Sequence, residues 1–89
     1  MIDLAAVFGE NLARVRKRQG MSQEELSVMA SVHRTEISQL ERGLRVARVD
    51  TLVKLKGSLG ISAEELLAGL EWTPGGVSYG AFVARESGR

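Results

Sequence analysis

The 89-residue sequence contains no cysteine, one histidine, one proline, one tryptophan, one tyrosine and two phenylalanines. Without cysteine the chain cannot form a disulfide or a thiolate metal site, and one histidine cannot build a zinc site. We therefore expect no metal and no cofactor. The absence of disulfides from so small a chain favours the cytosol. No apolar run approaches the ~18 residues that a membrane span needs, and no secretory signal pattern opens the sequence, so we expect no membrane association.

Catalytic constellations are also missing. The sequence shows no paired carboxylates on one helix face, no Ser/His/Asp set and no glycine-rich phosphate loop, so we expect neither an enzyme nor a small-molecule substrate. The net charge of +1, from 12 basic and 11 acidic residues, argues against a nucleic-acid partner only as an average. Residues 10–48 hold eight basic and five acidic residues (+3), whereas the remainder holds four and six (−2). Because phosphate binding depends on one face, a basic recognition side remains possible.

Capping residues and glycines divide the first 70 residues, which form one proline-free domain, into short helices. Ser22 and Glu25 have the spacing of a capping box, and Ser62 and Glu65 repeat it. The expected helices cover about residues 3–20, 22–31, 33–42, 50–60 and 62–70. Short links between five such helices predict a compact all-α bundle.

Residues 71–89 form a separate tail, and Pro74 followed by two glycines must break any helix there. Apolar and small or polar residues alternate from Val77 to Ala84, which predicts a strand. A lone strand is not stable in water, so it must pair, either with the same strand of a second copy or by folding back over its own domain. The tail is thus a possible dimerisation strand.

The third helix is unusual because only Ile37 and Leu40 are apolar. Its remaining polar side carries guanidinium, hydroxyl and amide groups, at Arg34, Thr35, Ser38 and Gln39. Such a side is either a solvated helix face or a surface that enters the DNA major groove. In the groove, arginine pairs with guanine O6/N7 and glutamine with adenine N6/N7.

The stretch from Gln23 to Gly43, followed by Asp50-Thr51-Leu52 and Leu59-Gly60-Ile61-Ser62, resembles the Cro/phage-repressor (XRE) helix-turn-helix family. The resemblance runs from about residue 8 to 70. Small Ser27, apolar Val32 in the turn and the spacing of Ile37 and Leu40 all match together. It implies a lambda-repressor-like bundle at residues 1–70 and a sequence-specific DNA-binding transcriptional regulator.

The resemblance also implies roles for individual residues. The positions expected to read bases are Arg34, Thr35, Ser38 and Gln39. The positions expected to contact phosphates are Gln23, His33, Arg42, Arg45 and Arg48. Arg16 and Glu41 match a pair that forms a partly buried salt bridge. Ser31 replaces the family's usual glycine and must adopt a left-handed or adjusted conformation, while His33 is a weak helix cap.

A single short helix reads only a few base pairs, which predicts a homodimer acting as a repressor on a palindromic operator in double-stranded DNA. We expect the dimer interface to use the fifth helix and the tail, through Leu66, Leu67, Leu70, Trp72, Tyr79 and Phe82. The alternative is an antitoxin-type interaction module. Its strand-like tail would bind a partner protein while its domain regulates its own operon.

Overall fold

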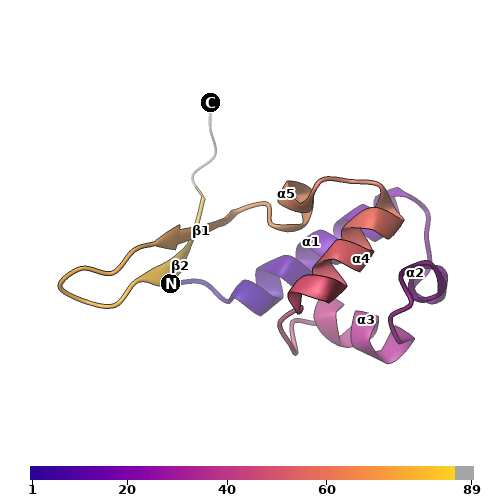
Figure 1. Cartoon of the computed structure of the whole chain (residues 1–89), viewed down its shortest axis with the longest axis horizontal. Coiled ribbons are helices and arrows are strands. Elements are labelled where there is room, and N and C mark those ends of the chain that lie inside the picture. The colour runs from indigo at the N-terminus through magenta and orange to yellow at the C-terminus, as the bar shows by residue number, and fades with distance from the viewer. Residues whose placement is uncertain (86–89) are drawn as a thin grey trace.

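The computed structural model describes residues 1–85, which form a helical body and a β-hairpin that projects from it (Figure 1). The elements are α1 (Leu4–Arg18), α2 (Gln23–Ala30), α3 (Arg34–Glu41), α4 (Val49–Leu59), α5 (Ala63–Leu66), β1 (Leu70–Thr73) and β2 (Ala81–Ala84). The predicted five helices are therefore present. Within the described range, no helix is both long and apolar enough to cross a membrane.

Local sequence signals explain where the first two helices begin. The Asp3 carboxylate accepts a hydrogen bond from the Ala6 N–H at 3.2 Å and caps α1. Ser22 and Glu25 form the predicted capping box at the start of α2, with Ser22 N–H to Glu25 Oε1 at 2.8 Å and Glu25 N–H to Ser22 Oγ at 3.0 Å. Because Glu25 accepts this backbone hydrogen bond, its pKa is lowered.

Apolar side chains from all five helices form one core, which lies around α1. Its buried side chains are Phe8, Leu12, Val15, Leu26, Ala30, Val32, Ile37, Leu40, Leu55, Leu59 and Leu66. Helix α1 packs against α3 and α5, and α2 packs against α3 and α4. Since α3 buries only Ile37 and Leu40, these two side chains hold it to the body and leave its polar side outside.

Helices α1 and α3 approach each other very closely at Gly9. A Cβ atom at this position would lie 2.8 Å from the Glu41 carbonyl oxygen and closer still to that of Leu40. Only glycine fits there. The next contact along the pair is at Gly43, which has φ +72° and whose added Cβ would meet the Cα of Ala6 at 3.0 Å. The C-terminal end of α3 is thus seated directly on α1.

The fifth helix is shorter than predicted, because α5 ends at Leu66 and Leu70 begins β1. Gly69, with φ +82°, turns the chain between them. The second capping box is also wrong, since Ser62 makes no side-chain cap hydrogen bond. The carboxylate that would complete it, that of Glu65, accepts instead from Arg18 Nη2 on α1 at 2.9 Å.

The tail contains a strand, but a shorter one than the alternation predicts. Only Ala81–Ala84 is extended as β2, while residues 74–80 form the hairpin loop. Strand β2 pairs antiparallel with β1, whose first residue, Leu70, is the end of the predicted fifth helix, and Trp72 lies opposite Phe82. The strand therefore finds its partner within the same chain. The Ile2 N–H also donates to the Phe82 carbonyl at 3.1 Å, so the N-terminus lies beside β2 (Figure 1).

Candidate nucleic-acid interface

The turn between α2 and α3 has the geometry that the sequence predicts. Ser31 adopts the left-handed conformation, with φ 54° and ψ 45°, and is the one residue other than glycine with positive φ among residues 1–85. The next residue, Val32, is buried, and its N–H donates to the Ser27 carbonyl at 3.2 Å. His33 caps α3 without a side-chain hydrogen bond and is exposed. The two helices and this tight turn form a helix-turn-helix.

The four predicted base-reading residues share the outer side of α3. At 100° per residue, Arg34, Thr35, Ser38 and Gln39 span about 140° of the helix, opposite Ile37 and Leu40. The Arg34 and Thr35 side chains are exposed, and those of Ser38 and Gln39 are half-buried. Within residues 1–85, the Arg34 side chain makes no hydrogen bond or ion pair. This end of α3 therefore offers an open guanidinium and hydroxyl surface.

Gln39 differs from the other three because its side-chain amide has a partner in the protein. Arg45 Nη1 donates to Gln39 Oε1 at 3.0 Å. The contact follows from the chain reversal after α3, where the Gly43 N–H donates to the Leu40 carbonyl and the Leu44 N–H to the Gln39 carbonyl. This is a Schellman motif, which satisfies the last carbonyls of the helix and turns the chain back along it. Arg45 is thereby brought beside Gln39.

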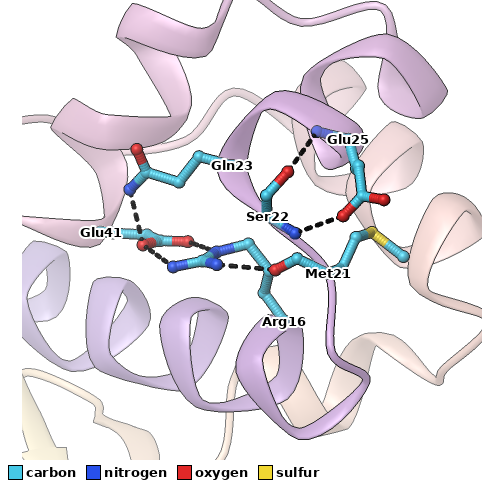
Figure 2. A network of polar contacts seen from close by, with 6 residues as sticks. All are labelled: Arg16, Met21, Ser22, Gln23, Glu25 and Glu41. Atoms are coloured by element: carbon cyan, nitrogen blue, oxygen red, sulfur yellow. Dashed lines mark hydrogen bonds and ion pairs between the residues drawn. The ribbon is translucent and has the colours of Figure 1, made fainter.

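A buried ion pair fixes the far end of α3 (Figure 2). Arg16 Nε and Nη2 donate to the two carboxylate oxygens of Glu41 at 2.6 and 2.9 Å, and Arg16 Nη1 donates to the Met21 carbonyl at 2.7 Å. The two side chains are only 9% and 7% exposed. Hydrogen bonding with Glu41 raises the pKa of Arg16 against the opposing effect of burial. The structure thus contains the ion pair that the family resemblance implies, joining α1 to α3.

The residues expected to contact phosphates have different surroundings. The Gln23 amide nitrogen donates to Glu41 Oε1 at 2.9 Å, so this side chain belongs to the ion-pair network as well as to the start of α2 (Figure 2). Arg42 is exposed at the end of α3. Arg48 precedes α4, and its Nε lies 3.3 Å from Asp50 Oδ1, with both side chains exposed. Arg42 and Arg48 thus both follow α3 in the sequence.

The residues expected at the dimer interface differ in how far their side chains are exposed. Leu66 has no exposed surface and Leu70 is buried, so neither side chain is available to a second copy in this conformation. Leu67 is half-buried. On the hairpin, Trp72 is 55% exposed, Tyr79 is 100% exposed, and Phe82 packs edge-to-face on Trp72 with ring centroids 5.0 Å apart.

Two positioning features are absent from the sequence-based predictions. Gly9 was detectable, because an isolated glycine inside an amphipathic helix indicates a close approach. Asn11, two residues further along α1, is buried, and its Nδ2 donates to the carbonyls of Leu66 and Ala68 at 2.9 Å each. This amide ties the end of α5 to α1. No local sequence signal identifies that role, because its partners lie more than 50 residues away.

Comparisons with known proteins agree with this geometry. The helix-turn-helix family model matches residues 12–66. An HTH-type transcriptional regulator of Sinorhizobium fredii is 37% identical over 75 residues, covering 84% of this chain and 97% of the relative. The control protein C.BamHI of Bacillus amyloliquefaciens is 35% identical, covering 73% of this chain and 82% of the relative.

Solved structures show the same similarity. The restriction-modification controller protein C.AhdI from Aeromonas hydrophila superposes with a TM-score of 0.68 at 32% identity, covering 70% of this chain and 94% of that one. The biofilm master regulator SinR, solved in complex with DNA, gives a TM-score of 0.65 at 31% identity, covering 67% and 97%. A SinR protein/SinI protein complex gives 0.65 at 31% identity, covering 67% and 59%.

The fold and the exposed side of α3 define a DNA-binding regulator. The chain belongs to the XRE-type helix-turn-helix family of transcriptional regulators, a family of DNA-binding proteins and not of enzymes.

Proposed function

We propose that this regulator is a sequence-specific repressor that binds a palindromic operator as a homodimer. The observation that carries the proposal is the outer side of α3. There Arg34 and Thr35 are exposed and free of protein partners within the described range, while Ile37 and Leu40 anchor the opposite side. An anchored helix with outward guanidinium and amide groups suits direct reading of base edges in the major groove.

Phosphate contacts complete this proposal. Arg42 and Arg48 lie after the recognition helix, Gln23 lies at the N-terminus of α2, and His33 lies in the turn. Gln23 has one amide N–H engaged with Glu41, and its second N–H can donate to a phosphate. Such contacts position the protein on the duplex and make binding salt-dependent, whereas the side chains of α3 select the sequence.

The experiment selects bound sites from a random pool of double-stranded DNA with the full chain. A homodimer that reads two half-sites enriches a palindrome with half-sites about one helical turn apart. Arg34→Ala should lower discrimination at one base pair per half-site by about 1–3 kcal/mol. The matched control is Lys54→Ala, which removes an exposed cation from α4, outside the helix-turn-helix. Enrichment of no sequence, or an equal loss on selected and random DNA for Arg34→Ala, contradicts the proposal.

The dimer interface that we propose lies where the hairpin meets the body. Leu67, Trp72 and Phe82 line one groove together with Leu4 of α1, whereas Leu70, which also lines it, is itself buried. The groove lining also includes the charged residues Glu64, Glu71 and Arg85. The exposed Trp72 and Phe82 give this groove an apolar part with charged residues around it, which is the composition that protein interfaces bury. Sedimentation of Trp72→Ser should show a weaker dimer than wild type. Val53→Ser removes an equally exposed apolar side chain from α4 and should not change the dimer.

The exposed hairpin loop also favours the antitoxin-type alternative. This loop, residues 74–80, presents Val77 and Tyr79, both fully exposed, and contains no charged residue. An apolar loop that projects from the domain is suited to contact another protein (Figure 1). A chain that is monomeric by itself, and that binds a partner protein in a manner lost in Tyr79→Ser, favours this alternative over the homodimer.

A further inference from the structure

We propose that Arg45 is a specificity-determining residue of the DNA interface, acting by positioning the Gln39 side chain. This inference rests on the proposed function, because it assigns how one base contact is oriented. The sequence places Arg45 among the phosphate-contacting arginines. The structure instead joins its Nη1 to Gln39 Oε1 at 3.0 Å, on the outer side of the recognition helix.

The contact is built into the backbone around it. The Leu44 N–H donates to the Gln39 carbonyl at 2.9 Å, so the residue before Arg45 is hydrogen-bonded to the main chain of the residue that Arg45 holds. Gly43, left-handed and pressed against Ala6 of α1, fixes the reversal that makes this possible. Arg45 therefore reaches Gln39 from a loop whose direction is set by the contact of Gly43 with α1.

The contact with Arg45 determines which hydrogen-bonding groups the Gln39 amide can present to a base. A free glutamine side chain can rotate to present either its carbonyl oxygen or its NH₂ group to a base. Arginine carries donors only and accepts nothing, so Arg45 can bond only to Oε1. With Oε1 held on the Arg45 side, Nε2 is left to donate outward, and the second lone pair of Oε1 remains open.

That arrangement matches adenine in the major groove, where N7 accepts a hydrogen bond and N6–H₂ donates one. Nε2 would donate to N7, and Oε1 would accept from N6 while still bonded to Arg45. The other arginines near the recognition helix differ. Arg42 is not hydrogen-bonded to a side chain within residues 1–85, and Arg48 lies against Asp50. Among the flanking arginines, Arg45 alone contacts a base-reading side chain in the described part of the chain.

The test measures the affinity of the full-length protein for its selected site and for each single-base-pair variant of that site. Wild type is compared with Gln39→Ala, Arg45→Ala and the double variant, and Arg42→Ala is the matched loss of one exposed arginine. We expect Gln39→Ala and Arg45→Ala to lose discrimination at the same base pair. The loss for Arg45→Ala should be about five- to tenfold, part of what a bidentate amide–adenine contact provides. The double variant should lose little more than Gln39→Ala, and Arg42→Ala should weaken all sites alike.

The outcomes separate the inference from the proposed function. If wild type selects a site and Arg45→Ala weakens every variant of it equally, Arg45 contacts phosphate only and the inference is overturned while the proposed function stands. The same holds if Gln39→Ala and Arg45→Ala affect different base pairs. A wild-type protein that selects no sequence overturns both. A simple folding defect lowers every affinity together, so it cannot imitate a loss confined to one base pair.

Discussion

Replacement of Gly9 by alanine tests the packing that seats the recognition helix. Gly9 is buried in α1 and faces the C-terminal end of α3. The added methyl group would lie 2.8 Å from the Glu41 carbonyl oxygen and nearer still to that of Leu40, closer than real Cβ contacts. Both are main-chain atoms, so no side chain can rotate away. The two helices must move apart.

The size of the effect follows from two opposing contributions. Forcing a methyl group into a close-packed contact costs about 1–3 kcal/mol. Alanine in place of glycine within a helix returns about 0.5–1 kcal/mol. Separation of the helices also stretches the ion pair between Arg16 and Glu41, which crosses the same contact. We expect a net loss of about 1–2 kcal/mol, which for a domain of this size lowers Tm by about 5–15 °C.

Thermal and urea unfolding followed by circular dichroism measures this difference. The matched control is Gly57→Ala, in the last turn of α4, where an added Cβ meets nothing within 4 Å. Gly57→Ala should raise stability by about 0.5–1 kcal/mol. If Gly9→Ala proves as stable as wild type, or gains stability as Gly57→Ala does, the close approach of α1 and α3 does not exist and the reasoning fails.

Three further substitutions test the turn, the ion pair and the cap. Ser31→Gly should raise stability by about 1 kcal/mol, because it relieves a left-handed serine, and Ser31→Ala should give no gain in Tm. Glu41→Ala should lower the free energy of unfolding by about 3–4 kcal/mol, since it leaves Arg16 buried without its partner. The double variant Arg16→Met/Glu41→Leu should recover more than half of that loss in urea unfolding, and equal losses for the single and double variants would count against a buried pair. Glu25 has a folded-state pKa lowered below its usual 4.5 by the Ser22 N–H, so its ionised form stabilises the fold above that pH. That contribution should decline as pH falls below about 4.5, and Glu25→Gln should show a smaller decline in urea unfolding over the same range.

The helical body could be predicted from the sequence wherever the deciding contact is local. Asp3 and the Ser22–Glu25 box are caps within one helical turn, and both are present. The same logic is wrong at Ser62, where Glu65 bonds to Arg18 on a helix 47 residues earlier. A capping pattern considers only the backbone N–H groups near the carboxylate in sequence. It cannot predict that the fold places a cation from another helix, here Arg18, within hydrogen-bond distance of the same carboxylate.

The hairpin shows a second limit of periodicity. Leu66, Leu67 and Leu70 have helical spacing, which predicts Leu70 as the end of the fifth helix, whereas Leu70 begins β1. The signal that separates helix from strand is Gly69, a glycine after the helix that takes positive φ. Alternation correctly indicates extended structure near Val83. It cannot show that the first half of the alternating run is a loop, because the register depends on what lies opposite.

Within the recognition surface, the sequence identified which side of α3 faces outward, since burial of Ile37 and Leu40 determines it. It did not identify the bond between Arg45 and Gln39. That bond depends on a chain reversal at Gly43, and therefore on the way the loop is pressed against α1. The sequence pattern thus predicts which residue types lie on the outer side of α3. The orientation of their side chains cannot be predicted from the pattern, because it depends on tertiary packing.

These contacts connect stability with DNA reading. The C-terminal end of α3 is fixed to α1 by the glycine contacts at Gly9 and Gly43 and by the ion pair of Arg16 with Glu41. The outer side of the same short helix carries the side chains that we propose read bases. An eight-residue helix moves as one rigid rod, so a displacement at its anchored end displaces Arg34 at the other. If the proposed function holds, Gly9→Ala should weaken binding to the selected DNA site at temperatures where the variant is still fully folded, although Gly9 is buried in α1 and is not part of the outer side of α3.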